Sequence, residues 1–385
     1  MIYLDNAAGS PLFDELIEAY SGFLRSSHVN ASATHGPAYD TRRELVNRAE
    51  AFLDRLDIDA EAASVVWTSG GTEANNLAIG GLAATMSVGS TFSAVTTITE
   101  HASVFEPFRH LESTGANLSW ARVAADGTID LDHFASLLNS ETKLVSICHV
   151  QTETGAVQDL VVIREIMDNH APLAKLHVDA IQALGKLDIP WHTARIDLLS
   201  LSGHKIHGPG GVGALIARHD CRLEPLFHGG GQQENLRSGS LDIAGIRAFC
   251  AATRMIMKRR PQTQRRVAGL NRRLRLQLDA LRTADGKPLA AQIHSSSTGS
   301  DYILSCSLPG YQGAVLARAL SAKGIIVGTG SACAAESKQP SRILMAMGVP
   351  EKVAFGSLRV SFGCRNRDSD GDAFCRSLQA VITEY

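Results

Sequence analysis

A lysine that follows a mostly apolar run in the middle of the chain is placed to do chemistry. Residues 198–201 are typical of a buried strand, and Ser202-Gly203-His204-Lys205 comes next. In open α/β sheets ligands bind outside the carboxyl ends of strands, so this lysine is predicted to meet a ligand. Ser202 and His204 can reach a phosphate, and closely spaced glycines let the backbone approach it: Gly208, Gly210, Gly211 and Gly213.

A second stretch predicts an anion site. The strand-like run 65–67 leads into Thr68-Ser69-Gly70-Gly71-Thr72-Glu73, and a helix is expected from about 73 to 85. The backbone N–H groups and the dipole at a helix start both favour a phosphate. Gly71 and Thr72 are therefore candidate phosphate ligands.

Further polar side chains follow three more strand-like runs. The run 94–98 leads to His101, 144–148 leads to Thr152, and 176–178 leads to Asp179 and Gln182. Each of these residues alone could be structural. Because they recur at successive strand ends, as Lys205 does, they are predicted to share one pocket.

Helical stretches separate these strands, which is the alternation expected of a doubly wound, mostly parallel α/β sheet. A chain of 385 residues exceeds one comfortable core. We predict a large domain at 12–254 and a smaller α/β domain made of 1–11 and 255–385. The smaller unit contains a strand at 302–307, a helix at 313–323 and a strand at 325–327.

Composition excludes several classes of protein. The net charge of −2 gives no general attraction to nucleic acid or membrane, and no apolar run approaches the roughly 20 residues that span a bilayer. Seven scattered cysteines without C-x-x-C spacing argue against a disulfide framework and against a zinc site, so no metal is expected. The beginning of the sequence lacks the features of a secretory signal, and cytoplasmic localisation is the expectation.

The region 244–283 has apolar residues every three or four positions, with arginines over much of the remaining surface. This pattern predicts an amphipathic helix with a solvated basic face; an acidic partner or a nucleic acid is the alternative. Pro261 is predicted to break the region into two helices.

Cys333 lies among small residues, before a helix expected near Ser341, and it is the candidate for a reactive thiol. GSAC at 330–333, followed by S-x-x-P-S-x-x-L at 337–344, resembles the active-site loop of NifS-like cysteine desulfurases. Ser202 to Gly213 is similar to the cofactor-lysine segment of class V, fold-type I pyridoxal phosphate (PLP) enzymes. The resemblance runs from residue 3 to about 363 and includes YLDNAA near the start.

The resemblance implies the fold-type I architecture, with a large domain around a mostly parallel sheet plus a smaller α/β domain. It also implies that Lys205 carries PLP, that His101 stacks on the ring and helps to move protons, and that Asp179 keeps the ring nitrogen protonated. The other implied cofactor-binding residues are Gly71, Thr72, Thr152, Gln182, Ser202, His204 and Ser240. In relatives the hydroxyl at the position of Ser240 reaches the phosphate of the neighbouring subunit, which implies a homodimer.

For the reaction, the resemblance implies that L-cysteine is converted to L-alanine. Arg359 and Asn30 would bind the substrate, and Cys333 would hold the sulfur as a persulfide. The sulfur would then pass to an acceptor protein for iron–sulfur assembly, tRNA thiolation or sulfur modification of DNA.

Two alternatives stay open. One is another PLP reaction on the same fold, such as that of an aminotransferase or a selenocysteine lyase. The other is a weakly active scaffold, since Thr152 stands where relatives usually have asparagine and the amino-terminal turn also departs from the pattern.

Overall fold

A seven-stranded sheet dominates the computed structural model, which describes residues 1–86, 91–330 and 339–384. The strand order is β2-β8-β7-β6-β5-β3-β4, and β8 runs antiparallel to both of its neighbours while the other pairs are parallel. The predicted mostly parallel sheet is therefore confirmed. The strands are β2 (Ala63–Thr68), β3 (Ser93–Thr97), β4 (Asn117–Ala121), β5 (Leu144–Cys148), β6 (Lys175–Asp179), β7 (Leu198–Ser202) and β8 (Gly213–Arg218).

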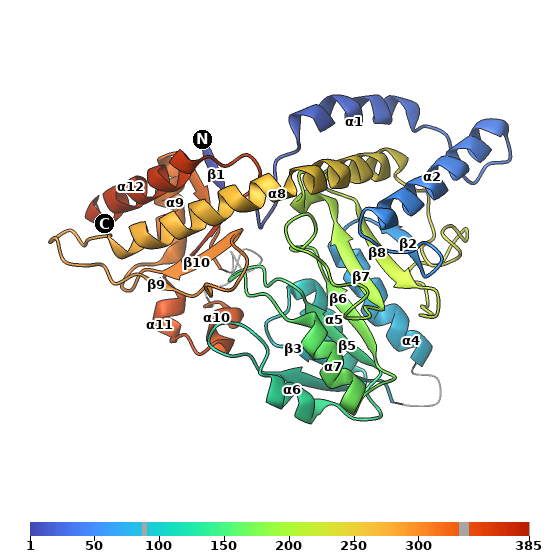
Figure 1. Cartoon of the computed structure of the whole chain (residues 1–385), viewed down its shortest axis with the longest axis horizontal. Helices are drawn as coiled ribbons and strands as arrows, with labels where there is room; N and C mark the ends of the chain where they lie inside the picture. Colours follow the sequence, from blue (N-terminus) through green and yellow to red (C-terminus); the bar gives the residue numbers. More distant parts are fainter. Residues whose placement is uncertain (87–90, 331–338, 385) are drawn as a thin grey trace.

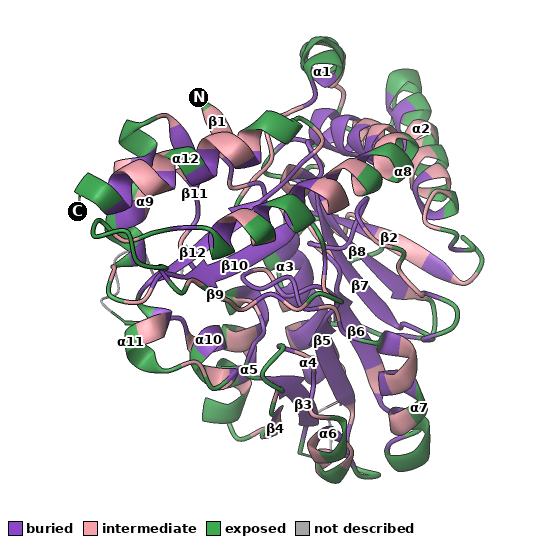
Figure 2. Cartoon of the chain, turned by 60° about the vertical axis from the view of Figure 1, so that its left-hand side comes forward, coloured by how far each residue is buried: buried purple, intermediate pink, exposed green. Residues whose placement is uncertain are grey.

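Helices cover both faces of this sheet (Figure 1), and successive strand residues enter opposite cores. Leu198, for example, joins the core shared with α3 to α5, whereas Leu199 joins the larger core on the other face. Figure 2 shows the central strands of this sheet buried between helices of mixed exposure, whereas the edge strands β2 and β4 are only partly buried. The helices of this part are α2 (Gly36–Asp54), α3 (Gly71–Asn76), the π-turn η1 (Leu77–Gly81), α4 (Leu82–Met86), α5 (Ala102–Ser113), α6 (Leu131–Leu137) and α7 (Leu160–His170).

Two small sheets form the remaining α/β unit. β10 (Ile303–Ser307) pairs antiparallel with β12 (Ser357–Ser361) and β9 (Gln292–Ile293). β1 (Ile2–Leu4) pairs parallel with β11 (Ile325–Val327), so the first strand of the chain lies against this unit. Its helices are α9 (Gly313–Ala322), α10 (Arg342–Ala346), α11 (Glu351–Ala354) and α12 (Asp368–Glu384).

A single long helix, α8 (Ile243–Asp279), connects the two parts, running from beneath α1 (Asp14–Ser26) to α12 in Figure 1. The predicted break at Pro261 is wrong. Losing one backbone hydrogen bond and accommodating the ring costs about 3 kcal/mol. The helix buries Ile256 before the proline and an apolar stripe after it, each side chain worth roughly 1.5–3 kcal/mol. The apolar stripe therefore outweighs the local penalty.

The basic face of α8 is partly used inside the molecule. Arg273 pairs with Asp372 of α12 at 2.7 Å, and Arg275 donates to the carbonyl of Ser295 at 3.0 Å. Arg265 and Arg272 are exposed. Internal contacts therefore account for part of the predicted basic surface.

As for membranes, none of the helices in the described ranges combines the length and apolarity that a bilayer crossing requires.

Candidate active site

The carboxyl ends of the parallel strands surround a cavity of about 390 Å³. Its walls come from the segments after β2, β3, β5, β6 and β7, with Ala8 of the amino-terminal segment and Gly211. The volume is in the range of small-molecule sites. Of the residues predicted for the site, the cavity brings together Gly71, Thr72, His101, Thr152, Asp179, Gln182, His204 and Lys205.

Lys205 lies in a single 3-10 turn, η2 (Gly203–Lys205), that starts where β7 ends. Its Nζ donates to the carbonyl oxygens of Ala7 at 2.6 Å and Ala8 at 2.7 Å. The amine is thus held between a strand end and the amino-terminal segment.

Ser202 is fully buried, and its Oγ lies 2.8 Å from Nδ1 of His204. Ser202 therefore orients His204. His204 lines the cavity and Ser202 does not. Burial, followed by the positive charge of Lys205, lowers the pKa of His204 to about 4. This imidazole is consequently neutral at pH 7.

The turn after β2 needs glycine for two different reasons. Gly70 has a φ of 150°, which side chains rarely adopt, and a Cβ on Gly71 would collide with Ile181. Helical structure then runs without interruption from Gly71 to Met86, through the π-turn η1. The helix expected from about 73 is confirmed, and its first N–H groups have no acceptor within the helix. The residues that carry these groups, Gly71, Thr72 and Glu73, line the cavity.

His101 caps the N-terminus of α5. Its Nδ1 accepts a hydrogen bond from the Ser103 N–H at 3.1 Å and lies 2.8 Å from Ser103 Oγ. Because Nδ1 accepts, the proton of the neutral ring is on Nε2. Burial lowers the pKa of His101, against the attraction of the nearby Asp179 carboxylate. The geometry and the pKa both favour a neutral imidazole.

Two residues that the sequence did not single out connect His101 to Asp179. Asn75 Nδ2 donates to Ser103 Oγ and to Asp179 Oδ2, both at 2.8 Å. Asp179 Oδ1 accepts from the N–H of Ile181 at 3.0 Å, so both carboxylate oxygens are held. No local sequence pattern indicated this connection.

On the opposite side of the site, Gln182 Nε2 donates to Ala7 O at 2.8 Å and to Thr152 Oγ1 at 3.2 Å. Its Oε1 accepts from the buried amine of Lys186 at 2.8 Å. Lys186 was also not singled out, although it stands four residues after Gln182. Thr152 is thus part of a hydrogen-bonded group rather than an isolated substitution.

Arg359 borders a second cavity of about 520 Å³, which shares Ala8, His101, Thr152 and Lys205 with the first. The guanidinium donates to Asp5 Oδ1 at 2.6 Å and to the carbonyl of Thr152 at 3.1 Å. Its Nε is buried and has no partner among the described residues. The guanidinium is thus held in place beside the second cavity by Asp5 and the Thr152 carbonyl.

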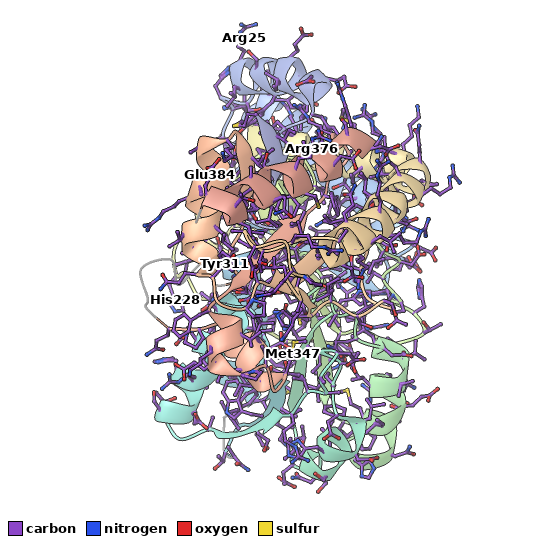
Figure 3. All side chains as sticks on the ribbon, turned by 90° about the vertical axis from the view of Figure 1, so that its left-hand side faces the viewer. Arg25, His228, Tyr311, Met347, Arg376 and Glu384 are labelled. Carbon is purple, nitrogen blue, oxygen red and sulfur yellow. The ribbon has the colours of Figure 1, made fainter. Side chains whose placement is uncertain are left out.

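Two more predicted residues, Asn30 and Ser240, are like Ser202 in that they do not line these cavities. Asn30 is exposed and accepts from the Ser32 N–H at 2.9 Å in the connection between α1 and α2. Ser240 is exposed at the end of a loop that also contains His228, which lies at the edge of the molecule in Figure 3. Cys333 lies in the stretch 331–338, outside the described residues. Gly330 and Gln339, the described residues directly before and after that stretch, border the second cavity.

Comparison with known proteins identifies the family. A family model described as aminotransferase class-V matches residues 2–374. This chain belongs to that family. Cysteine desulfurase IscS 1 of Archaeoglobus fulgidus is 32% identical over 388 residues, covering 99% of this chain and 97% of the relative. An IscS-like cysteine desulfurase of Mycobacterium tuberculosis is 34% identical over 395 residues, covering 99% and 96%.

Solved structures agree. One described as a NifS-like protein covers 100% of both chains at 27% identity, with a TM-score of 0.91. Another, SspA in complex with cysteine, covers 94% of this chain and 99% of its own at 28% identity, with a TM-score of 0.81. The predicted fold and the predicted NifS-like cysteine desulfurase family are therefore confirmed.

The class-V family is PLP-dependent, and the residues of the cavity fit that cofactor. A Cβ on Gly70 would meet no described atom within 4 Å, so this cavity-lining glycine borders open space at the helix start, where a phosphate is favoured. Asp179 supplies a carboxylate and Lys205 an amine inside the same cavity. These are the groups that a phosphorylated pyridine aldehyde requires.

Proposed function

We propose that this protein converts L-cysteine to L-alanine and holds the released sulfur as a persulfide on Cys333 before passing it to an acceptor protein. The observation that carries the proposal is that Lys205, His101 and Asp179 lie in one cavity at the strand ends. The cysteine desulfurases among its relatives support it, as does a structural neighbour described in complex with cysteine.

The residues that would hold PLP divide by the part they contact. Gly71, Thr72 and His204 would surround the phosphate, and Lys205 would bind the cofactor covalently. Asp179, kept in position by Asn75, would face the ring nitrogen. When bound, PLP supplies an electron sink that allows bonds at the substrate carbons to break.

The chain's own residues would handle the protons. The Lys205 amine lies between the two cavities, where it can take or return a proton on a substrate carbon. His101 would exchange its proton at Nε2, since Nδ1 is occupied by Ser103.

Arg359 would bind the substrate carboxylate. Asp5 and the carbonyl of Thr152 hold two of its guanidinium nitrogens, which fixes the orientation of the guanidinium beside the second cavity. The Cys333 thiolate would then attack the substrate sulfur, and the bond between that sulfur and the β-carbon would break. The carbon takes up a proton and becomes the methyl group of alanine.

The active form would be a homodimer. Ser240 is exposed, yet its loop is tied to the phosphate turn by an ion pair between Arg237 and Glu73 at 2.8 Å. A cavity of about 760 Å³ beside the site shares Thr72 and His101 and is bordered by the exposed Leu226. We propose that a second subunit covers this region and receives the Ser240 hydroxyl. Asn30, also exposed, would bind substrate in the assembled site.

The six free cysteines among the described residues favour a reducing compartment, which supports the cytoplasm.

The decisive experiment is Cys333→Ser, which keeps the side-chain size but removes the strong nucleophile. We expect PLP binding to be normal, while alanine production and persulfide labelling both fall by about 100-fold or more. Absorbance, amino-acid analysis and alkylation followed by mass spectrometry measure the three quantities. Cys364→Ser and Cys375→Ser serve as controls that should retain both activities. Alanine formed at the parent rate by Cys333→Ser would contradict the proposal, and an oxo acid product would indicate an aminotransferase.

A further inference from the structure

Lys186 is a buried lysine next to the cavity that the proposed function does not use. Its residue is 6% exposed, and it follows Gln182 by four positions in the turns after β6. Within the described chain, the hydrogen bond of its Nζ goes to the amide oxygen of Gln182 at 2.8 Å and not to a carboxylate. A buried ammonium group is costly, so a lysine with a neutral partner at this place calls for an explanation.

Lys186 determines which way the amide of Gln182 points. In its ammonium form Lys186 can donate hydrogen bonds but cannot accept them, so the amide oxygen faces Lys186. At the other end, the carbonyl of Ala7 can accept but not donate, so the amide nitrogen must face Ala7, at 2.8 Å. The orientation of Gln182 is therefore fixed at both ends of the side chain.

That orientation in turn determines the role of Thr152. Gln182 Nε2 also donates to Thr152 Oγ1 at 3.2 Å, which occupies one lone pair of the hydroxyl oxygen. No described residue accepts the hydroxyl hydrogen of Thr152, and this residue lines the cavity. An asparagine has N–H donors of its own, whereas a threonine has a single rotatable hydrogen. Neighbours must therefore set the direction of that hydrogen.

We infer that Lys186, Gln182 and Thr152 form a donor relay that presents the Thr152 hydroxyl hydrogen to an acceptor oxygen in the cavity. Lys186 donates to Gln182, Gln182 donates to Thr152, and Thr152 donates to the ligand. The inference rests on the proposed function, in which PLP occupies the cavity. The acceptor is then the oxygen on the pyridine ring of PLP. Lys186 acts through Gln182 and is a positioning residue rather than a catalytic one.

The charge environment is consistent with a strong donor at the start of the relay. Burial, followed by the positive charge of Lys205, lowers the pKa of Lys186 to about 7, with Arg359 acting in the same direction. Near neutral pH a substantial fraction of the amine is still ionised, and hydrogen bonds from charged donors are stronger than neutral ones. Donors in a chain also polarise one another.

A double-mutant cycle on PLP affinity tests the relay. Lys186→Met removes the first donor at similar size, and Thr152→Val removes the hydroxyl at similar shape. We expect each single variant to bind PLP about tenfold more weakly than the parent, and the double variant to be no more than about tenfold weaker, because both changes remove the same hydrogen bond. The dissociation constants come from titrating apo-protein with PLP, and melting temperatures are recorded on the same samples.

The melting temperature separates a positioning role from a structural one. Lys186→Met should leave the melting temperature of the apo-protein unchanged or raise it, since a buried amine is removed. Thr152→Ser, which keeps the hydroxyl, should bind PLP within about twofold of the parent. Lys175→Met is the matched control: it removes a lysine at the opposite end of β6, paired with Asp197 at 3.0 Å, and should leave PLP affinity unchanged.

Unchanged PLP affinity in Lys186→Met would overturn the relay, and so would a double variant about 100-fold weaker than the parent. If Lys186→Met does not fold, Lys186→Gln replaces it, because glutamine keeps a hydrogen-bond donor. This variant is expected to lose less than about threefold in PLP affinity, and a tenfold loss would also overturn the relay. Failure of the proposed function gives a different result, because the parent protein would then bind PLP and yet make no alanine from cysteine.

Discussion

At the residue scale, the site depends on where neighbouring strands end. Asp179 closes β6 and Ser202 closes β7, and the two strands pair in parallel, with Asp179 opposite Ser200. A lysine three positions after the end of β7 therefore enters the same cavity as the carboxylate. The carbonyls of Ala7 and Ala8 accept from the amine of Lys205, while Asn75 donates to the carboxylate of Asp179.

Lys205→Ala should abolish covalent attachment of PLP while leaving the cavity able to bind it. Treatment with borohydride fixes PLP to the parent protein as a mass increase on the intact chain, and we expect no such increase in the variant. Lys287→Ala, which changes an exposed lysine in a remote loop, should retain the full mass increase. A covalent adduct that persists in Lys205→Ala would show that another amine carries the cofactor.

Site residues that directly follow a strand could be predicted from the sequence. The residues that hydrogen-bond to them and hold them in place could not. The carboxyl ends of parallel strands share one edge of a sheet, so the convergence of His101, Asp179 and Lys205 could be expected from the strand pattern alone. Asn75 meets Asp179 across 104 positions of sequence. That contact depends on how α3 packs relative to the end of β6, which no local pattern encodes, and the burial of Lys186 likewise depends on packing between distant segments.

At the scale of elements, local rules fail where packing supplies more free energy. Pro261 does not end α8, because the apolar stripe continues on both sides of it. The predicted domain boundary at 254/255 falls inside this same helix. The division into 12–254 and the remainder stays a proposal, in which α8 is a rigid connection between the two parts rather than a linker.

Glu153 connects elements on both sides of the Cys333 segment. Its Oε2 accepts from Ser341, the N-cap of α10, at 2.5 Å, and a Cβ on Gly330 would lie 2.9 Å from the same oxygen. Burial raises the pKa of Glu153 from 4.5 to about 7, against the hydrogen bond from Ser341 and the charges of Arg359 and Arg342. The folded state thus favours the protonated carboxyl group.

This raised pKa predicts the pH dependence of stability. Because the folded pKa exceeds the unfolded one, the favourable contribution of the protonated group is complete below about pH 4.5 and is lost as pH rises through about 7. Glu153→Gln mimics the protonated form at every pH. We expect it to be more stable than the parent by about 3 kcal/mol at pH 8, and by much less at pH 5, in thermal unfolding.

The matched control is Glu351→Gln, on the exposed start of α11, which should show no such pH-dependent difference. A Glu153→Gln variant whose advantage over the parent is equal at pH 5 and pH 8 would contradict the assigned pKa.

At the scale of the whole molecule, the first residues bring the two parts together at the site. β1 pairs with β11 of the small unit, while Ala7 and Ala8, a few residues later, bind Lys205 at the end of the large sheet. Asp5 continues the connection by pairing with Arg359 of β12. One short segment thus places Arg359, proposed to bind the substrate, relative to Lys205, proposed to carry the cofactor. The single chain nevertheless leaves Ser240 outside the cavity.

The proposed homodimer can be tested by mixing two inactive variants. Lys205→Ala removes the cofactor amine, and Ser240→Glu would put a carboxylate against the partner's phosphate. If each site takes Lys205 from one subunit and Ser240 from the other, every mixed dimer has one intact site. Random exchange makes half of the dimers mixed, so activity should return to about a quarter of the parent value.

As a control, mixing Lys205→Ala with Asp179→Ala should restore nothing if both residues serve the same site, as their common cavity in one chain indicates. A protein that is monomeric and active at the assay concentration would rule out the shared site, and so would a Lys205→Ala and Ser240→Glu mixture that exchanges subunits without regaining activity.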